Sequence, residues 1–208
     1  MKLLLYCTKA KPYLVKDAYL VKDGGKYFIG SSSCLRKWSL NGKIVAECDY
    51  VIEKITCRKI GGEWESYGEY TDFIELSKKS MLTQQELCNY LSKNAGGYAI
   101  HIKNLHIFDE LKDFSEYSKN VEHCKCDECL ENCKKYCKYY YAKNNITQTI
   151  NTGCTKYALL YKAPQNMMYV FDLEEKKVLI SIRPEWLCKI LNGEKTIEVR
   201  KKVLKEMI

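Results

Sequence analysis

Four polar side chains near the end of the chain combine types that can bind a ligand or react with one. They lie in the stretch LNGEKTIEVRKK, residues 191–202, where apolar and polar residues alternate. Because successive side chains of a strand point to opposite faces, this alternation predicts that Thr196, Glu198 and Arg200 form one row. Lys195 lies at the bend just before the row. We therefore expect a hydroxyl, a carboxylate, a guanidinium and an ammonium close together.

Each of these groups suits the recognition of a nucleotide. An arginine offers a planar fork of donors for phosphate, carboxylate or a base, and a lysine offers a mobile ammonium. A glutamate accepts hydrogen bonds from amino groups on a base edge. The alternative is a solvent-facing strand on which Glu198 and Arg200 form a surface ion pair, worth about 0–1 kcal/mol.

Charge and hydropathy narrow the class of protein. The 208 residues suit one main core, and 34 Lys and Arg against 26 Asp and Glu give a net charge of +8. This charge favours a polyanionic partner without identifying it. No apolar run approaches the ~18–20 residues of a membrane span, and MKLLLYCTK is too short in its apolar part for a secretory signal. We expect a cytoplasmic protein whose cysteines are reduced thiols or metal ligands.

A strand, a short helix and a second strand must position the polar row. KVLISI, residues 177–182, is predicted to be a strand. Pro184 suits the first position of the following helix, and Gly193 suits its C-terminal end. The strand KTIEVR follows directly.

Other elements are expected upstream. Strands are predicted at residues 2–7, 43–55 and 96–108, with a register break near Val51 in the second. Asp-Gly-Gly predicts a hairpin turn within residues 21–32. Thr83 and Glu86 form a capping-box pattern that begins a helix. Residues 57–80 are predicted to be a long loop, and 109–117 a turn with a short helical segment.

The C-terminal unit resembles a known family. ISIRPEWLCKILNGEKTIEVR, residues 180–200, is similar to the signature of the ASCH family, whose PUA-like β-barrel carries a Gly-x-Lys-x-x-Glu-x-Arg motif. Gly193, Lys195, Glu198 and Arg200 supply that motif here. The resemblance implies an α+β fold, namely a PUA-like (ASCH) mixed β-barrel with short flanking helices.

The order of the resembling segments differs from that of the family. In bacterial and phage members the motif lies near the N-terminus and is followed by segments similar to LLLYCTKAKPYLV, GKIVAECDYVIEKI and GGYAIHIKNLHIFDELKDFSEY. A tail similar to KAPQNMMYV ends those relatives. Those segments precede the motif in this chain. The resemblance covers about two-thirds of the chain and implies a circularly permuted barrel. Residues 1–117 would form its main part, 118–176 a Cys- and Tyr-rich appendage and connector, and 177–208 the strand-helix-strand unit that completes it. The alternative is a dimer that exchanges this C-terminal arm.

The resemblance also implies a ligand-binding cleft and two competing functions. The cleft would contain, besides Lys195, Glu198 and Arg200, the residues Thr8, Lys9 and His101; a single structural hydrogen bond is the alternative role for His101. As a binding module, the protein would hold RNA, a nucleotide or a modified nucleoside. As an enzyme, it would resemble the small ASCH member that hydrolyses acetylcytidine with a Lys and a Thr; a nuclease is a further alternative.

The enzymatic comparison has one clear departure from the family pattern. Lys195 occupies the position of the catalytic lysine of that small member, but Glu198 stands where that member has its nucleophilic threonine. Glu198 would then activate a water as a general base, with Thr196 nearby on the same row. We therefore expect binding to be the main function, with Lys195, Glu198 and Thr196 as the catalytic residues if the protein is an enzyme.

A cysteine cluster raises a separate question about metal binding. Residues 118–145 contain few aliphatic side chains and cannot form a conventional core. Four thiolates could hold a structural zinc ion there and order the segment, and we expect the ligands to be Cys126, Cys129, Cys133 and Cys137. Cys154 is an alternative fourth ligand, and reduced thiols without metal are the alternative state.

Overall fold

A computed structural model of the chain describes residues 1–7, 19–30, 38–39, 43–91, 96–117, 166–172 and 175–208. Their centre is a seven-stranded sheet with the order β10-β7-β5-β1-β9-β8, in which β6 also pairs with β5. Within this sheet β1 and β9 are parallel and the other pairs are antiparallel. The strands are β1 (Lys2–Cys7), β5 (Lys43–Ile60), β6 (Glu63–Gly68), β7 (Gly96–Asp113), β8 (Met167–Asp172), β9 (Glu175–Ile182) and β10 (Ile197–Arg200).

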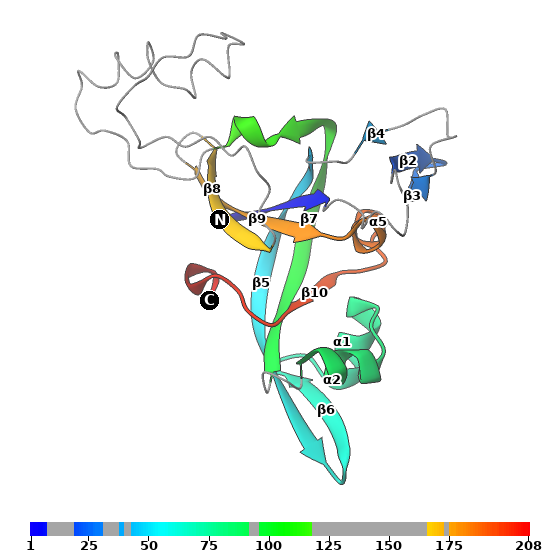
Figure 1. The fold of residues 1–208 in the computed structure, drawn as a ribbon, viewed down its shortest axis with the longest axis vertical. Coiled ribbons are helices and arrows are strands. Elements are labelled where there is room, and N and C mark those ends of the chain that lie inside the picture. The colour runs from blue at the N-terminus through cyan, green and yellow to red at the C-terminus, as the bar shows by residue number, and fades with distance from the viewer. Residues whose placement is uncertain (8–18, 31–37, 40–42, 92–95, 118–165, 173–174) are drawn as a thin grey trace, which may run out of the picture.

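The strands β5 and β7 form the long axis of the molecule, as Figure 1 shows. Each has 18 residues, and their pairing shifts register between Ile44 and Ala46 and again between Glu47 and Asp49. Asn104 in β7 adopts a left-handed conformation with φ 48°. Such irregularities bend a strand and increase its twist. The predicted register break near Val51 is therefore found a few residues earlier.

The prediction of a loop at residues 57–80 is wrong. β5 continues to Ile60, turns through Gly61 and Gly62 at positive φ, and returns as β6. This hairpin projects beyond the rest of the described residues (Figure 1). Helix α1 (Phe73–Ser80) follows, and the Asp72 carboxylate accepts a hydrogen bond from the Glu75 backbone N–H at its start. Two glycines provide the tight turn because they reach positive φ without strain.

The predicted capping box is confirmed at helix α2 (Gln84–Leu91). The Thr83 hydroxyl accepts from the Glu86 N–H at 3.2 Å, and the Glu86 carboxylate accepts from the Thr83 N–H at 2.8 Å. Helices α1 and α2 cover one face of the sheet beside β10. The apolar residues buried there, called the α1–α2 cluster, are Ile55, Cys57, Leu76, Leu87, Cys88, Leu91, Ala99, Ile197 and Val199.

The C-terminal unit has the predicted strand, helix and strand. Helix α5 (Pro184–Leu191) begins with proline at its N-terminus, and Gly193 follows its end with φ 73°. The helix packs over the opposite face of the sheet from α1 and α2. Its buried side chains join the α5 cluster, which includes Leu3, Leu5, Val45, Ile100, Val178, Ile180, Leu187 and Ile190.

A small three-stranded sheet is attached to α5. It consists of β2 (Tyr19–Asp23), β3 (Lys26–Gly30) and β4 (Trp38–Ser39), and the predicted hairpin turn is confirmed at Gly24 and Gly25. The Asn192 side chain fixes this sheet to the helix. Its oxygen accepts from the Tyr27 N–H at 2.7 Å, and its amide donates to the Tyr27 carbonyl at 2.8 Å.

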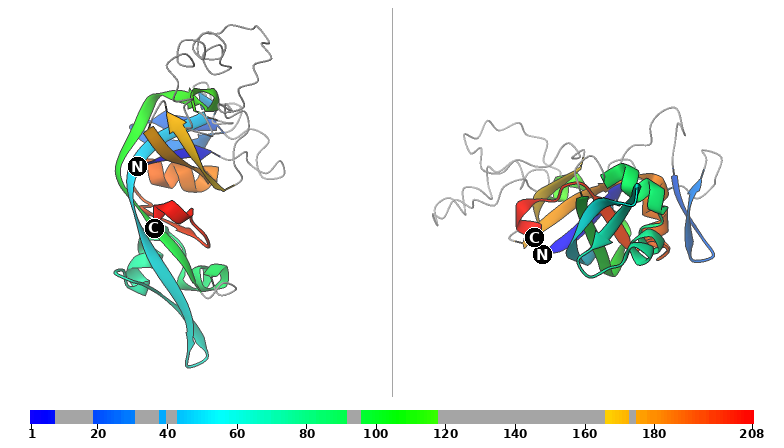
Figure 2. Two further views of the ribbon diagram at one scale, coloured as in Figure 1. Left: turned by 90° about the vertical axis from the view of Figure 1, so that its left-hand side faces the viewer. Right: turned by 90° about the horizontal axis from the view of Figure 1, so that it is seen from below.

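The fold class is a mixed α+β arrangement, as predicted, but the sheet is not closed. Among the described strands, β8 and β10 are the two ends of the strand order, and no ladder joins them. The C-terminal unit nevertheless lies within the sheet, because β9 pairs with β1 and β10 pairs with β7. The N- and C-terminal ends lie on the same side of the molecule (Figures 1 and 2). In the part of the chain that the structure describes, no helix has the length and apolarity to cross a membrane.

Candidate functional site

Two members of the predicted row of polar residues, Glu198 and Arg200, are found on the α5 side of β10. Ile197 and Val199 point into the α1–α2 cluster, so Glu198 and Arg200 point to the opposite face. The Glu198 carboxylate lies between two cations. Its Oε2 is 3.4 Å from Lys195 Nζ and its Oε1 is 2.9 Å from Arg200 Nε. The structure therefore brings Lys195, Glu198 and Arg200 together as one chain of charges, which we call the motif triad.

Lys195 is buried, with only 3% of its surface exposed. Its ammonium donates to the Ser80 carbonyl at 2.7 Å and lies 5.1 Å from the centre of the Trp186 ring. Ser80 ends α1, and the carbonyls at a helix C-terminus favour a cation. Burial lowers the pKa of the Lys195 amine, although the Glu198 carboxylate opposes that change. The Lys195 ammonium is thus fixed within the protein. The sequence had instead predicted a mobile ammonium that contacts a phosphate of the ligand.

Arg200 spans the gap between β10 and β9. Besides its contact with Glu198, its Nη1 donates to Asn166 Oδ1 at 3.1 Å and its Nη2 donates to the Ser181 carbonyl. The Ser181 N–H in turn donates to the Asn166 carbonyl at 2.8 Å. A guanidinium has five N–H donors, so these contacts leave donors over for a ligand. Sequence reasoning missed Asn166 and Ser181, which come near Arg200 only through the pairing of distant strands.

Thr196 is held at the start of the row by its backbone. Its N–H donates to the Lys79 carbonyl at 3.1 Å, and its carbonyl accepts from the Ile102 N–H at 2.9 Å. These bonds attach the segment before β10 to both α1 and β7. Thr8 and Lys9, the other residues predicted for the cleft, lie outside the described residues.

His101 does not join the motif triad. It pairs with Ile197 in the ladder between β7 and β10, whereas Glu198 pairs with Ile100. Directly paired residues share a face of a sheet, so His101 and Glu198 lie on opposite faces. The expectation that His101 lies in one cleft with Glu198 is therefore wrong. The error arose because strand pairing, which sets the face of each residue, was not readable from the sequence.

His101 instead contacts Glu53, a buried carboxylate that sequence reasoning missed. His101 Nε2 lies 2.6 Å from Glu53 Oε2, and Glu53 is only 1% exposed. The Glu53 carboxylate also accepts from the N–H groups of Tyr70 and Thr71 and from the Thr71 hydroxyl. Burial raises the pKa of Glu53, but these hydrogen bonds outweigh burial and lower it. These contacts of Glu53 were not predictable, because the pattern of residues 57–80 predicts a loop and does not indicate the turn after β6 that supplies the donors.

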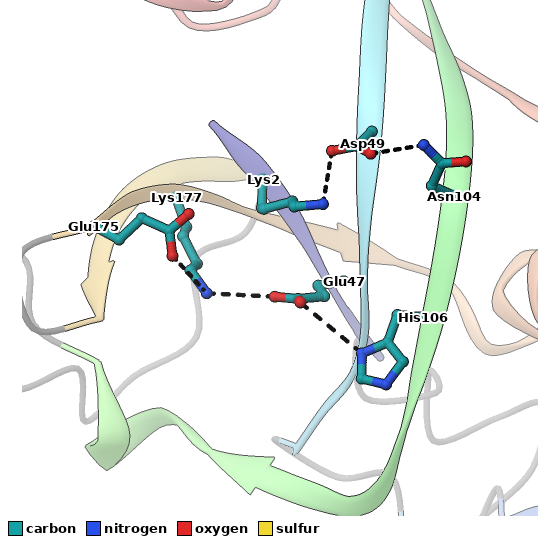
Figure 3. Close-up of polar contacts among 7 residues, drawn as sticks. All are labelled: Lys2, Glu47, Asp49, Asn104, His106, Glu175 and Lys177. Atoms are coloured by element: carbon teal, nitrogen blue, oxygen red, sulfur yellow. Dashed lines mark hydrogen bonds and ion pairs between the residues drawn. The ribbon is translucent and has the colours of Figure 1, made fainter.

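A second polar network crosses four strands on the same face as His101. Figure 3 shows its members, which we call the charged band: Lys2, Glu47, Asp49, Asn104, His106, Glu175 and Lys177. The buried Lys177 ammonium lies 3.3 Å from Glu47 and 3.2 Å from Glu175. Lys2 lies 2.8 Å from Asp49, which also accepts from the Asn104 amide. Each ammonium of the charged band faces at least one carboxylate, so ion pairing within the sheet explains these side chains.

The described cysteines are buried thiols. Burial raises the pKa of Cys7 and Cys48 to about 12 and that of Cys188 to about 11. These side chains are therefore protonated at neutral pH and are poor nucleophiles and metal ligands. No group of three or more metal-ligating side chains occurs among the described residues. The predicted zinc ligands Cys126, Cys129, Cys133 and Cys137, and the alternative Cys154, lie outside that part of the chain.

No family model matches the chain, and neither a curated protein nor a solved structure matches it. A functional role for the motif triad is therefore supported only by its geometry and by the sequence resemblance described above.

Proposed function

We propose that the protein is a circularly permuted ASCH-like domain that binds RNA or a modified nucleoside through Glu198 and Arg200. The observation that carries this proposal is the motif triad, in which one carboxylate is fixed between two cations on an open edge of the sheet. The positions of the two chain ends on one side of the molecule support the permutation, because rejoining them would preserve the sheet.

The triad supplies a donor and an acceptor side by side. The side chains of Glu198 and Arg200 are 12% and 16% exposed, whereas that of Lys195 is 2% exposed. Glu198 and Arg200 are thus the groups that a ligand reaches. A cytosine matches them, since its exocyclic amino group donates to a carboxylate while its ring nitrogen and carbonyl oxygen accept from a guanidinium.

Lys195 has a positioning role in this proposal. It cannot swing out to a phosphate without breaking its bond to the Ser80 carbonyl and leaving that carbonyl buried. Its ammonium holds one oxygen of Glu198, so the other oxygen and the Arg200 fork have a fixed orientation. Prearranged donors and acceptors bind more tightly because less conformational entropy is lost.

The test compares cytidine and uridine monophosphates by calorimetric titration. Uracil presents a carbonyl where cytosine presents an amino group, so we expect about tenfold or greater preference for cytidine, corresponding to ~1.4 kcal/mol or more. Glu198→Gln should remove the preference, because an amide can donate to the uracil carbonyl. Glu110→Gln, which changes an exposed carboxylate on β7, is the matched control.

Arg200→Lys provides a second variant that keeps the charge but removes the fork. It should weaken binding of both nucleotides, with folding checked by circular dichroism. Equal binding of cytidine and uridine monophosphates by the native protein, or no binding of either, would contradict the proposed role of Glu198 and Arg200.

The alternative function, hydrolysis of an acetylated cytidine, is favoured by one specific observation. Lys195 is a buried amine with a lowered pKa, 3.4 Å from a carboxylate, and ionisable groups perturbed in this way are concentrated at catalytic sites. In that reaction Glu198 would take a proton from a water that attacks the acetyl carbonyl. The bond from the acetyl carbon to the exocyclic nitrogen would then break, the nitrogen would take up that proton, and acetate and cytidine would be released. The test is incubation with acetylcytidine and chromatographic detection of cytidine. Lys195→Ala and Lys195→Met should both abolish product formation while the folded content is unchanged; turnover that persists in both would exclude the role of Lys195.

A further inference from the structure

A row of three side chains crosses the sheet beside the motif triad. Arg200 on β10 pairs with Tyr98 on β7, and Tyr98 pairs with Lys54 on β5. Neighbouring strands are about 4.8 Å apart, so the three side chains stand next to one another on one face. The next row along the strands contains Glu198. The aromatic ring is therefore flanked by a cation on each side and adjoins the proposed base-binding pair.

The row is positioned to meet solvent. Lys54 is exposed, while Tyr98 and Arg200 are half-buried. Within the described part of the chain, no hydrogen bond, ion pair or ring contact is found for the Tyr98 side chain or the Lys54 ammonium. An aromatic ring between cations is the arrangement with which single-stranded nucleic acids are bound, because any base can stack on the ring while cations contact the backbone.

We propose that Lys54, Tyr98 and Arg200 form a platform that binds the nucleotide next to the one held by Glu198 and Arg200, so that the partner is a single strand of RNA. This inference rests on the proposed function and extends it from one nucleotide to a chain. Tyr98 stacks on the neighbouring base, and Lys54 contacts the phosphate beyond it. The strand runs across β10, β7 and β5, away from α5.

The distinguishing experiment compares cytidine monophosphate with a fluorescein-labelled cytidine trinucleotide. Native protein should bind the trinucleotide at least tenfold more tightly. Tyr98→Leu should remove most of that gain and leave the affinity for the monophosphate unchanged, whereas Tyr98→Phe should keep it. Tyr90→Leu is the matched control, because Tyr90 is an exposed tyrosine on α2 with the Lys201 ammonium over its ring.

Salt dependence tests the contact of Lys54 separately. For single strands each phosphate contact contributes about −0.7 to the slope of log K against log salt concentration. Lys54→Gln should reduce the magnitude of the slope for the trinucleotide by about that amount. Lys103→Gln, which changes an exposed lysine on the opposite face of β7, should leave it unchanged.

The outcomes separate the two proposals. If the monophosphate binds but the trinucleotide binds no more tightly, or Tyr98→Leu has no effect, the platform is excluded and the base-binding pair stands. If the trinucleotide binds through Tyr98 while the monophosphate shows no preference for cytidine, the platform stands and the role of Glu198 is excluded. If neither ligand binds, both proposals are excluded.

Discussion

The buried carboxylate of Glu53 shows how much a single side chain can organise. It accepts hydrogen bonds from the turn after β6 and from His101 on β7, and so connects three parts of the chain. A carboxylate with several donors is strongly favoured in its ionised form. Its removal leaves those donors buried without an acceptor.

We predict that Glu53→Gln lowers the free energy of unfolding by about 2–4 kcal/mol at pH 7, because the new amide hydrogens oppose the backbone donors of the turn. Urea denaturation followed by circular dichroism measures this change. Glu110→Gln, which replaces an exposed carboxylate on the same sheet, should change stability by less than about 0.5 kcal/mol. Equal effects of the two substitutions would contradict the role assigned to Glu53.

The pH dependence of stability should report the same carboxylate. The pKa of Glu53 is lower in the folded protein than in the unfolded chain, where it is near 4.3. Its contribution is therefore complete above that value and is lost as pH falls through the folded-state pKa. Below about pH 4.3 the stability of the native protein should fall more steeply than that of Glu53→Gln. If the urea midpoints of the two proteins change equally with pH across this range, Glu53 does not make this contribution.

The motif triad predicts an asymmetry between its members. In the described structure Glu198 is the anion that faces both Lys195 and Arg200. Glu198→Gln leaves two cations without a counter-charge, whereas Lys195→Met leaves Glu198 paired with Arg200. We therefore expect Glu198→Gln to lower the free energy of unfolding by about 2 kcal/mol more than Lys195→Met. Chemical denaturation of both variants at pH 7 measures the difference, and a larger loss for Lys195→Met would contradict this arrangement.

At the scale of elements, Gly68 allows β6 to end against the Glu53 carboxylate. A Cβ at this position would lie 2.2 Å from Glu53 Oε1 and 2.7 Å from the Thr71 carbonyl oxygen. Gly68→Ala should therefore lower the free energy of unfolding by about 1–3 kcal/mol. Because one of the two clashes involves Glu53, Gly68→Ala should lower the free energy of unfolding by less when Glu53 is already replaced by alanine. A double-mutant cycle measures this coupling. If the two changes in the free energy of unfolding simply add, the Cβ at position 68 does not contact the Glu53 carboxylate.

Elements defined by local chemistry were predictable from the sequence. The Asp-Gly-Gly turn, the Thr83 and Glu86 capping box and the Pro184 helix start each depend on residues close in sequence. The missed helix α1 also had a local signal, since Asp72 stands three residues before Glu75 at its start. That signal was masked by the Tyr- and Gly-rich composition of the stretch before it.

Features that depend on the pairing of distant strands were not predictable. The alternation of Thr196, Glu198 and Arg200 was correct for Glu198 and Arg200, because it needs only the geometry of one strand. The face occupied by His101 depends on the register between β7 and β10, which no local pattern reports. The burial of Lys195 has the same origin, because its contact with Ser80 joins residues 115 positions apart.

At the scale of the whole molecule, the C-terminal unit supplies an internal part of the sheet. β9 lies between β1 and β8, and α5 covers Leu3 and Leu5. Deletion of residues 178–208 should therefore abolish cooperative unfolding, whereas deletion of the exposed Ile208 alone should have little effect. Thermal denaturation distinguishes these results. A cooperative transition in the longer deletion would show that the sheet is stable without β9 and β10.

Rejoining the ends tests the permutation directly. A chain that starts at Glu175 and connects Ile208 to Met1 through a flexible linker keeps every strand pair of the sheet, because the new break lies in the connection between β8 and β9. We expect this chain to unfold cooperatively and to retain the nucleotide preference of the native order. If the rearranged chain does not fold, the proposed circular permutation is contradicted.

The central position of β1 also has a consequence for biosynthesis. Among the described strands, β1 precedes all others in the chain, and its parallel neighbour β9 follows it by about 170 residues. β5 pairs with one edge of β1, and the other edge has no partner until β9 has been translated. We therefore expect the nascent chain to expose an unpaired apolar edge until β9 is translated, an arrangement that favours chaperone binding during translation and aggregation when translation stalls.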